Sequence, residues 1–229
     1  MDPPATVLAP AGGRAGSKET DLMHARVMTA PQKRALSELG PAATRHGFVL
    51  AGGTAVALHL GHRRSVDLDW FTDRPFPDPL ALAANLRAEG VPLETEEVAP
   101  GTLHGQVRGV KVSFLEFRYP LVEAPRPWAA GRCSLASLAD LSAMKLAALA
   151  QRGARKDFAD IYALVREFRP LPELVGLYQR KFAAKDPGHL LFALAFFDDA
   201  ETEPMPAMLW PVTWSEIKKS IRTALKGMS

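Results

Sequence analysis

The order of apolar and polar positions divides the chain into a mixed first half and a helical second half. Helical spacing over Gln32–His46 predicts a helix that Gly40–Pro41 should break. A short apolar run at Phe48–Ala51 and an alternating run at Ser65–Phe71 predict two strands. The segment between them, Thr54–Leu60, has the character of a short helix.

The remaining patterns extend this division. Two or three strands are expected between Leu93 and Phe117, and the last helix should begin at the capping box Thr213-Trp-Ser-Glu216 and continue to Lys226. Further helices are predicted over Pro79–Glu89, Leu135–Gln151, Lys156–Phe168, Leu174–Phe182 and Leu190–Phe197.

These elements predict an α+β fold in which a mixed sheet with flanking helices is followed by a helical C-terminal half. We place the α/β core at residues 23–130 and the helical region at residues 131–229. Residues 1–22 are rich in Pro, Ala and Gly without an apolar period, so we expect a loose N-terminal leader.

Composition narrows the class of protein. The chain has 229 residues and a single cysteine, Cys133, which excludes an intramolecular disulfide and favours a reducing compartment. No apolar run approaches the roughly 20 residues that span a bilayer, and the N-terminus lacks a signal-peptide pattern. We therefore expect a cytoplasmic protein with no membrane association. A net charge of +3 is too small to indicate a nucleic-acid partner.

Two acids in the predicted strand Ser65–Phe71 form the first candidate site. Residues two apart in a strand point to the same side, so Asp67 and Asp69 should present two carboxylates a short distance apart. Such a pair repels itself unless a cation neutralises it, and hard oxygen ligands suit Mg²⁺ or Mn²⁺. The alternative is an exposed polar strand face without a metal.

Upstream, Gly52, Gly53 and Thr54 connect a strand to a helix. Glycines let the backbone approach a ligand closely, and free N–H groups at a helix start bind phosphate oxygens. Thr54 could donate its hydroxyl to a phosphate or cap the helix. A phosphate-binding turn followed by a metal-binding pair is what nucleotidyl transfer requires.

Two later residues could complete such a site. Lys145 lies in an apolar helix stripe, where it either points its ammonium at a triphosphate or lays its stem on the core. Asp157 and Asp160 lie outside the apolar stripe of the following helix. An acid in a first helical turn is favourable in itself, by about 0.3–1 kcal/mol, which is the alternative for Asp157.

Three segments together resemble a known family. Residues 50–71 (Leu-Ala-Gly-Gly-Thr through Val-Asp-Leu-Asp-Trp-Phe), Met144–Leu149 and Arg155–Tyr162 are similar to the AbiEii/AbiGii-type nucleotidyltransferases, which are polymerase-β-like proteins. Several are toxins of toxin–antitoxin or phage-defence pairs. The resemblance implies that Gly53 and Thr54 contact nucleotide phosphates, that Asp67 and Asp69 bind metal, and that Lys145 and Asp157 complete the site.

The chain departs from this resemblance at one place. Polymerase-β-like enzymes commonly add a third carboxylate from a neighbouring strand, here Val110–Phe117, where Ser113 stands at the expected position. Glu116 could replace it only if the strand bulges or bends. Either Asp157 supplies the missing group, or the metal is held weakly, or catalysis is lost.

Other candidates are weighed against plainer interpretations. Arg63 and Arg64 could reach a triphosphate or an RNA backbone, with Arg64 assigned to the nucleotide. The alternative is a solvated loop pair, or an ion pair with the nearby acids. His59 and His62 are expected at a helix or loop surface, because no further ligands at zinc-site spacing accompany them. Cys133 should be inert.

We therefore expect a Mg²⁺-dependent nucleotidyltransferase that uses an NTP. RNA such as tRNA, a protein and a small hydroxyl compound remain open as acceptors, and the resemblance implies an antitoxin protein as partner. The first alternative is a module of the same fold that binds nucleotide or a partner without turnover. The second is a nucleic-acid-binding protein that uses only Arg63 and Arg64 together with Arg155 and Lys156.

Overall fold

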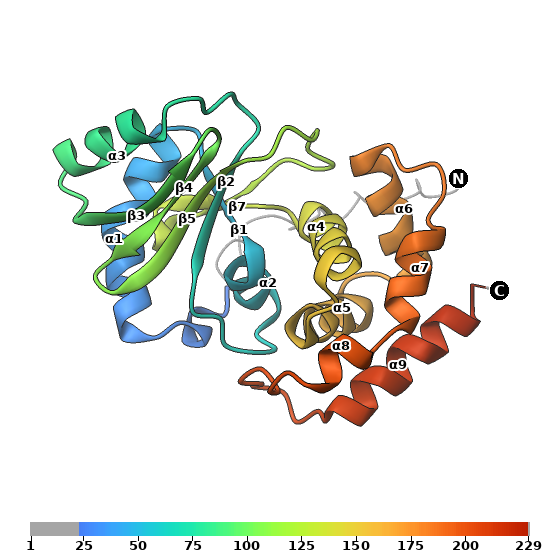
Figure 1. The fold of residues 1–229 in the computed structure, drawn as a ribbon. Helices are drawn as coiled ribbons and strands as arrows, with labels where there is room; N and C mark the ends of the chain where they lie inside the picture. The colour runs from blue at the N-terminus through green and yellow to red at the C-terminus, as the bar shows by residue number, and fades with distance from the viewer. Residues whose placement is uncertain (1–22, 229) are drawn as a thin grey trace, which may run out of the picture.

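The computed structural model describes residues 23–228, so the predicted leader at residues 1–22 lies outside the described residues. One mixed sheet forms the N-terminal half, and a group of helices forms the C-terminal half beside it (Figure 1). This confirms the predicted α+β architecture. No helix among the described residues is long and apolar enough to cross a membrane.

The sheet has seven strands in the order β3-β4-β5-β2-β1-β7-β6. Strand β2 pairs antiparallel with β1 and parallel with β5. The strands are β1 (Val49–Ala51), β2 (Leu68–Thr72), β3 (Leu93–Ala99), β4 (Thr102–Val107), β5 (Val110–Glu116), β6 (Arg126–Trp128) and β7 (Cys133–Leu135).

Helices cover the two sides of the sheet differently. Helices α1 and α3 contact the face whose residues include Leu103, Val112 and Phe114, whereas α2 and α4 adjoin the other side. The helices are α1 (Ala30–Arg45), α2 (Gly52–Leu60), α3 (Pro79–Ala88), α4 (Leu138–Arg152), α5 (Arg155–Glu167), α6 (Leu171–Phe182), α7 (Gly188–Ala195), α8 (Asp198–Glu201) and α9 (Trp214–Lys226), with short 3₁₀ turns at Ala25–Val27 and Ala129–Gly131. The predicted capping box at the start of α9 is confirmed.

The predicted break in the first helix is wrong, because α1 continues through Gly40 and Pro41. A proline ring clashes with the Cβ of the residue before it, and glycine has no Cβ. Gly40 also lies so close to the sheet end that a Cβ there would stand 2.5 Å from the Gly131 carbonyl oxygen. The helix thus continues through Pro41, although this residue has no N–H to donate to a backbone hydrogen bond.

Strands β6 and β7 were not expected. Each has three residues, too few to show an alternating pattern, and β7 is fixed by parallel pairing of Leu135 with Leu50 of β1. The sheet therefore extends to Leu135, past the boundary placed at residue 130. Helix α4 starts only after Ser137, whose side chain accepts a hydrogen bond from the Asp140 N–H.

Candidate active site

A cleft of about 490 Å³ lies where the sheet meets the helical half. Its walls come from the start of α2, from β2 and β5, from α4 and the start of α5, and from a C-terminal segment. The lining residues are Gly52, Gly53, Arg63, Arg64, Ser65, Val66, Asp67, Asp69, Phe71, Leu115, Leu141, Met144, Lys145, Ala148, Arg152, Lys156, Pro206 and Ala207. The cleft thus gathers most of the residues that the sequence singled out.

Both predicted metal ligands line this cleft. Asp69 lies in β2, and Asp67 directly precedes that strand. Burial raises the pKa of Asp69, and the neighbouring charge of Asp67 raises it further, against smaller opposing effects of Lys145 and Ser113. Two carboxylates that disfavour each other's charge fit a divalent cation, whose binding would relieve the repulsion.

The two glycines at the start of α2 provide space for their neighbours. A Cβ on Gly52 would stand 2.2 Å from Asp69 Oδ2, and one on Gly53 would stand 2.6 Å from Arg63 Nη2. Gly52 also has a φ of +64°, a conformation that favours glycine. Glycine therefore lets the N-terminus of α2 lie directly against Asp69, and the unpaired N–H groups of that turn suit phosphate oxygens.

Thr54 is placed differently from the expectation. Its side chain is buried and is not part of the cleft lining. Its hydroxyl donates a hydrogen bond of 2.5 Å to the carbonyl oxygen of Asp67. Thr54 thus connects α2 to the backbone of the first aspartate instead of pointing at a phosphate.

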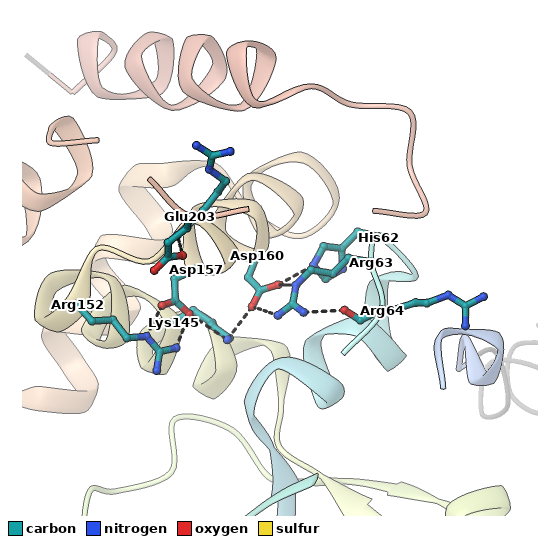
Figure 2. A network of polar contacts seen from close by, with 9 residues as sticks. His62, Arg63, Arg64, Lys145, Arg152, Asp157, Asp160 and Glu203 are labelled. Carbon is teal, nitrogen blue, oxygen red and sulfur yellow. Dashed lines mark hydrogen bonds and ion pairs between the residues drawn. The ribbon is translucent and has the colours of Figure 1, made fainter. Parts of the chain in front are cut away.

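Asp160 is the centre of a buried ion-pair network that sequence reasoning missed (Figure 2). Its Oδ2 lies 2.7 Å from Lys145 Nζ and 2.8 Å from Arg63 Nη2. Its Oδ1 lies 2.6 Å from Arg63 Nε and 2.7 Å from His62 Nε2. We call His62, Arg63, Lys145, Arg152, Asp157 and Asp160 the Asp160 network.

The charges in this network outweigh the cost of burial. Burial alone would raise the pKa of Asp160, but the charges of Arg63 and Lys145 and the hydrogen bond from His62 hold it well below its usual value. The network joins the turn after α2 to α4 and α5. A signal was present, because Asp157 and Asp160 are three apart and share one helix face.

Lys145 and Asp157 contact each other, but only Lys145 reaches the cleft. Lys145 Nζ lies 3.3 Å from Asp157 Oδ1. Arg152 donates to both Asp157 oxygens, at 2.7 and 2.9 Å. Because these cations occupy the fully buried Asp157 carboxylate, the structure gives no support to Asp157 as the missing third acid.

The expectations for the histidines and for Arg63 need correction. His62 and Arg63 are buried instead of solvated, because α2 ends at Leu60 and the following residues bond to Asp160 of α5. Burial lowers the pKa of His62, despite the hydrogen bond to Asp160 that raises it. His59 is half-buried, and its Nε2 lies 3.0 Å from the Ala136 carbonyl oxygen.

The position of the expected third carboxylate is occupied by Ser113. Ser113 pairs with Asp69 across β2 and β5, and its side chain acts to lower the pKa of the Asp69 carboxyl. Glu116 is directed elsewhere, since it accepts from the Phe76 N–H at 2.6 Å and pairs with Arg118. Within residues 23–228 no group of three or more His, Cys, Asp or Glu is arranged to hold a metal ion.

Cations surround the outer part of the cleft. Arg64 and Lys156 are exposed, and the side chain of Arg152 is 50 % exposed. Of these, the sequence assigns Arg64 to the nucleotide, and Lys156 only to the nucleic-acid-binding alternative. Arg64 is held by its backbone, because its N–H donates to the Ala207 carbonyl oxygen at 2.8 Å.

The other end of the cleft is apolar. Phe71 and Leu115 lie on neighbouring strands, and Leu141 and Met144 face them from α4. Phe71 thus lines the cleft beside the second aspartate, whereas Trp70 is fully buried in the core. Cys133 is buried away from the cleft, and burial raises the pKa of its thiol to about 12, so the thiol stays protonated near neutral pH.

Comparison with known proteins gives a family and a fold. A sequence profile described as "Nucleotidyl transferase AbiEii toxin, Type IV TA system" matches residues 34–226. The chain is 31% identical over 204 residues to the uncharacterized protein aq_aa25 of Aquifex aeolicus (strain VF5), covering 88% of this chain and 97% of that protein.

Solved structures agree with the fold. The nucleotidyltransferase toxin MenT4 (Rv2826c) of Mycobacterium tuberculosis H37Rv matches with a TM-score of 0.54 at 16% identity, covering 84% of this chain and 81% of that one. JHP933 of Helicobacter pylori matches with a TM-score of 0.50 at 15% identity, covering 90% and 93%. At such identities these structures bear on the fold alone.

Proposed function

Because the chain belongs to the AbiEii family of nucleotidyl transferase toxins of type IV toxin–antitoxin systems, we propose that its cleft binds an NTP with a divalent cation and transfers a nucleotidyl group to a hydroxyl acceptor. One observation carries the proposal: Asp67 and Asp69 line a single cleft together with Gly52 and Gly53 at the N-terminus of α2, and Asp69 lies directly against Gly52. These carboxylates would hold a Mg²⁺ or Mn²⁺ ion, which would supply positive charge that offsets the charge developing on the triphosphate.

The residues of the chain would share the remaining tasks. The N–H groups at Gly52 and Gly53 would bind phosphate oxygens. Lys145, Arg152 and Lys156 would neutralise the triphosphate from the opposite wall. The acceptor oxygen would bond to the α-phosphorus while the bond to the β-phosphate oxygen breaks, so that pyrophosphate leaves and the hydroxyl proton passes to solvent.

We propose RNA, such as the end of a tRNA, as the acceptor. The exposed cations Arg64, Arg152 and Lys156 beside the metal pair support this choice, because phosphate backbones are bound through such side chains. Proteins and small hydroxyl compounds are the competing acceptors, and the same assay distinguishes them.

The test incubates the purified chain and Mg²⁺ with each α-³²P-labelled NTP, total RNA and total protein. Label should enter RNA, and Asp69→Asn should abolish it, whereas Glu94→Gln, an exposed carboxylate on β3, should not. Label in protein would replace RNA as acceptor, and pyrophosphate without labelled polymer would indicate a small molecule. The transfer proposal fails if no NTP gives label or pyrophosphate, with or without an antitoxin partner.

We also propose that the family's toxin role and antitoxin partner apply to this chain. Expression of the wild-type chain should arrest bacterial growth, and Asp69→Asn should remove the effect at equal protein level. Unaffected growth with active wild-type enzyme would contradict the toxin role and leave the transferase activity standing.

A second candidate is a nucleotide-binding module without turnover. It is favoured by Ser113, which lies beside Asp69 where a third carboxylate was expected. This candidate predicts tight binding of the Mg²⁺–NTP complex, without pyrophosphate release in any acceptor mixture.

A further inference from the structure

Polar side chains form a row across three strands, leading from the metal pair towards the edge of the sheet. Asp69 of β2 pairs with Ser113 of β5, and Ser113 pairs in turn with His104 of β4. Residues that pair directly across strands point to the same face, so these three side chains are neighbours. His104 Nδ1 lies 3.1 Å from Ser113 Oγ, and the Ser113 side chain, paired in register with Asp69, acts to lower the pKa of the Asp69 carboxyl.

The number of protons fixes the direction of these bonds. A serine hydroxyl carries one proton, and an ionised carboxylate can only accept. A Ser113 hydroxyl that donates to Asp69 leaves its oxygen to accept a hydrogen bond from His104. In this arrangement Nδ1 of His104 is the donor.

On the sheet side, the row of Ser113 and His104 supports Asp69, because the other neighbours considered do not bond to it. Glu116 is held by the Phe76 N–H, and Gly52 offers no side chain. On the helical side the ammonium of Lys145 is paired with Asp157 and Asp160. Ser113 is thus the polar side chain that adjoins Asp69 from the neighbouring strand β5.

We propose that His104 is a positioning residue for the cation site: it orients the Ser113 hydroxyl, which holds one oxygen of Asp69 and leaves the other free for the divalent ion. The inference rests on the proposed metal role of Asp67 and Asp69. Hydrogen-bond partners behind a metal ligand fix its orientation, and their loss typically weakens metal binding about 10- to 100-fold. His104 acts one residue further away, so its loss should fall at or below the lower end of that range.

The test measures Mn²⁺ binding to the full-length chain by electron paramagnetic resonance, with the metal alone. Ser113→Ala should weaken Mn²⁺ binding about 10-fold, and His104→Ala about 3- to 10-fold. The matched control is Gln106→Ala, because Gln106 is the next residue on the same face of β4 and donates to Glu96 instead. This control should bind Mn²⁺ like the wild type.

A double variant tests whether His104 acts through Ser113. Ser113→Ala combined with His104→Ala should bind Mn²⁺ as weakly as Ser113→Ala alone, since the intermediary is already gone. A further loss in the double variant would show that His104 acts by another route and would overturn the inference.

Two amide substitutions separate positioning from folding. The side-chain N–H of Asn can stand where Nδ1 of His104 stands, whereas Gln reaches further. His104→Asn should therefore retain near wild-type Mn²⁺ affinity, and His104→Gln should bind as weakly as His104→Ala. Equal affinities for Asn and Gln would overturn the inference even if His104→Ala fails to fold.

The inference and the proposed function fail in different ways. If the wild-type chain binds no Mn²⁺, or if Asp69→Asn does not remove the binding, the proposed metal site itself is wrong. If the wild type binds Mn²⁺ and His104→Ala binds it equally well, only the role of His104 is wrong.

Discussion

Asp160 shows how a single buried carboxylate organises its surroundings. An unpaired charge in the protein interior is so costly that buried acids are found with partners. Arg63, Lys145 and His62 supply those partners from two different parts of the chain. The same lysine also lines the cleft, so one residue links the stability of the interior to the proposed chemistry.

Asp160→Asn should destabilise the protein by about 3–5 kcal/mol, because it leaves the buried Arg63 guanidinium without its counter-charge. The depressed pKa of Asp160 also sets the pH dependence. Its stabilisation is fully present above the unfolded pKa and is lost as the pH falls through the lower folded pKa. Urea unfolding of the wild type and of Asp160→Asn, at pH 7 and in acid, checks the size of the effect and its pH dependence. The free energies of unfolding of the two proteins should differ less in strong acid.

Asp69→Asn should have the opposite effect on the metal-free protein. The folded pKa of Asp69 is raised, so the folded protein favours the neutral carboxyl. The folded state is therefore more stable at low pH, and it loses this stability as the pH rises through the folded pKa and Asp69 ionises. The variant removes this loss and should melt at a higher temperature than the metal-free wild type at pH 7. Added Mg²⁺ should raise the melting temperature of the wild type alone, as differential scanning fluorimetry would show. A lower melting temperature for the variant would contradict the repulsion between the two aspartates.

Among the elements, α1 shows how a close backbone approach can fix the position of a helix. It runs past the 3₁₀ turn Ala129–Gly131 at a distance that only glycine at position 40 permits. Contacts of this kind form between segments that are distant in the sequence, so local sequence patterns do not predict them.

Gly40→Ala should therefore destabilise the protein although alanine is the better helix former. The helix preference favours alanine by about 1 kcal/mol, whereas overpacking costs about 1–3 kcal/mol. The contact of 2.5 Å is with a backbone oxygen, which cannot move aside as a side chain would, so the second effect should win. Chemical denaturation checks the sign. Ser37→Ala, an exposed position on the same helix, is the control and should change stability little.

Locally encoded features of the fold and the site could be predicted from the sequence. The glycine turn, the Asp67–Asp69 pair and the capping box of α9 each occupy a few consecutive residues. By contrast, the β7 strand, the burial of His62 and the Asp160 network depend on segments that meet only after folding. For example, nothing near His62 in the chain indicates that residue 160 will lie against it.

Across the whole molecule, a C-terminal segment returns to the α/β half and closes one side of the cleft. The Leu209 N–H donates to the His62 carbonyl oxygen at 2.8 Å, and Met208 forms an isolated bridge with Arg63. Pro206 and Ala207 of the same segment line the cleft. The cleft wall is therefore held largely by backbone hydrogen bonds.

Leu209→Pro should loosen this wall, because proline removes the N–H that bonds to His62. A net hydrogen bond contributes about 0.5–1.5 kcal/mol, so nucleotide affinity should fall roughly twofold to tenfold with helix content unchanged. Leu209→Ala keeps the N–H and should bind like the wild type. Calorimetric titration with an NTP and Mg²⁺, together with far-UV circular dichroism, checks this; equal affinity in the proline variant would show that the segment does not support the site.

The Asp160 network also constrains how this chain can diverge. A substitution of Arg63, Lys145 or Asp160 alone leaves a buried charge without its partner. Homologous proteins that keep the fold should therefore change these three positions together or keep all of them. Substitution of the exposed cations Arg64 and Lys156 leaves no buried charge unpaired, so these positions can change when the substrate changes. Over evolutionary time the interior of this protein should drift in correlated steps, while the cleft mouth adapts one residue at a time.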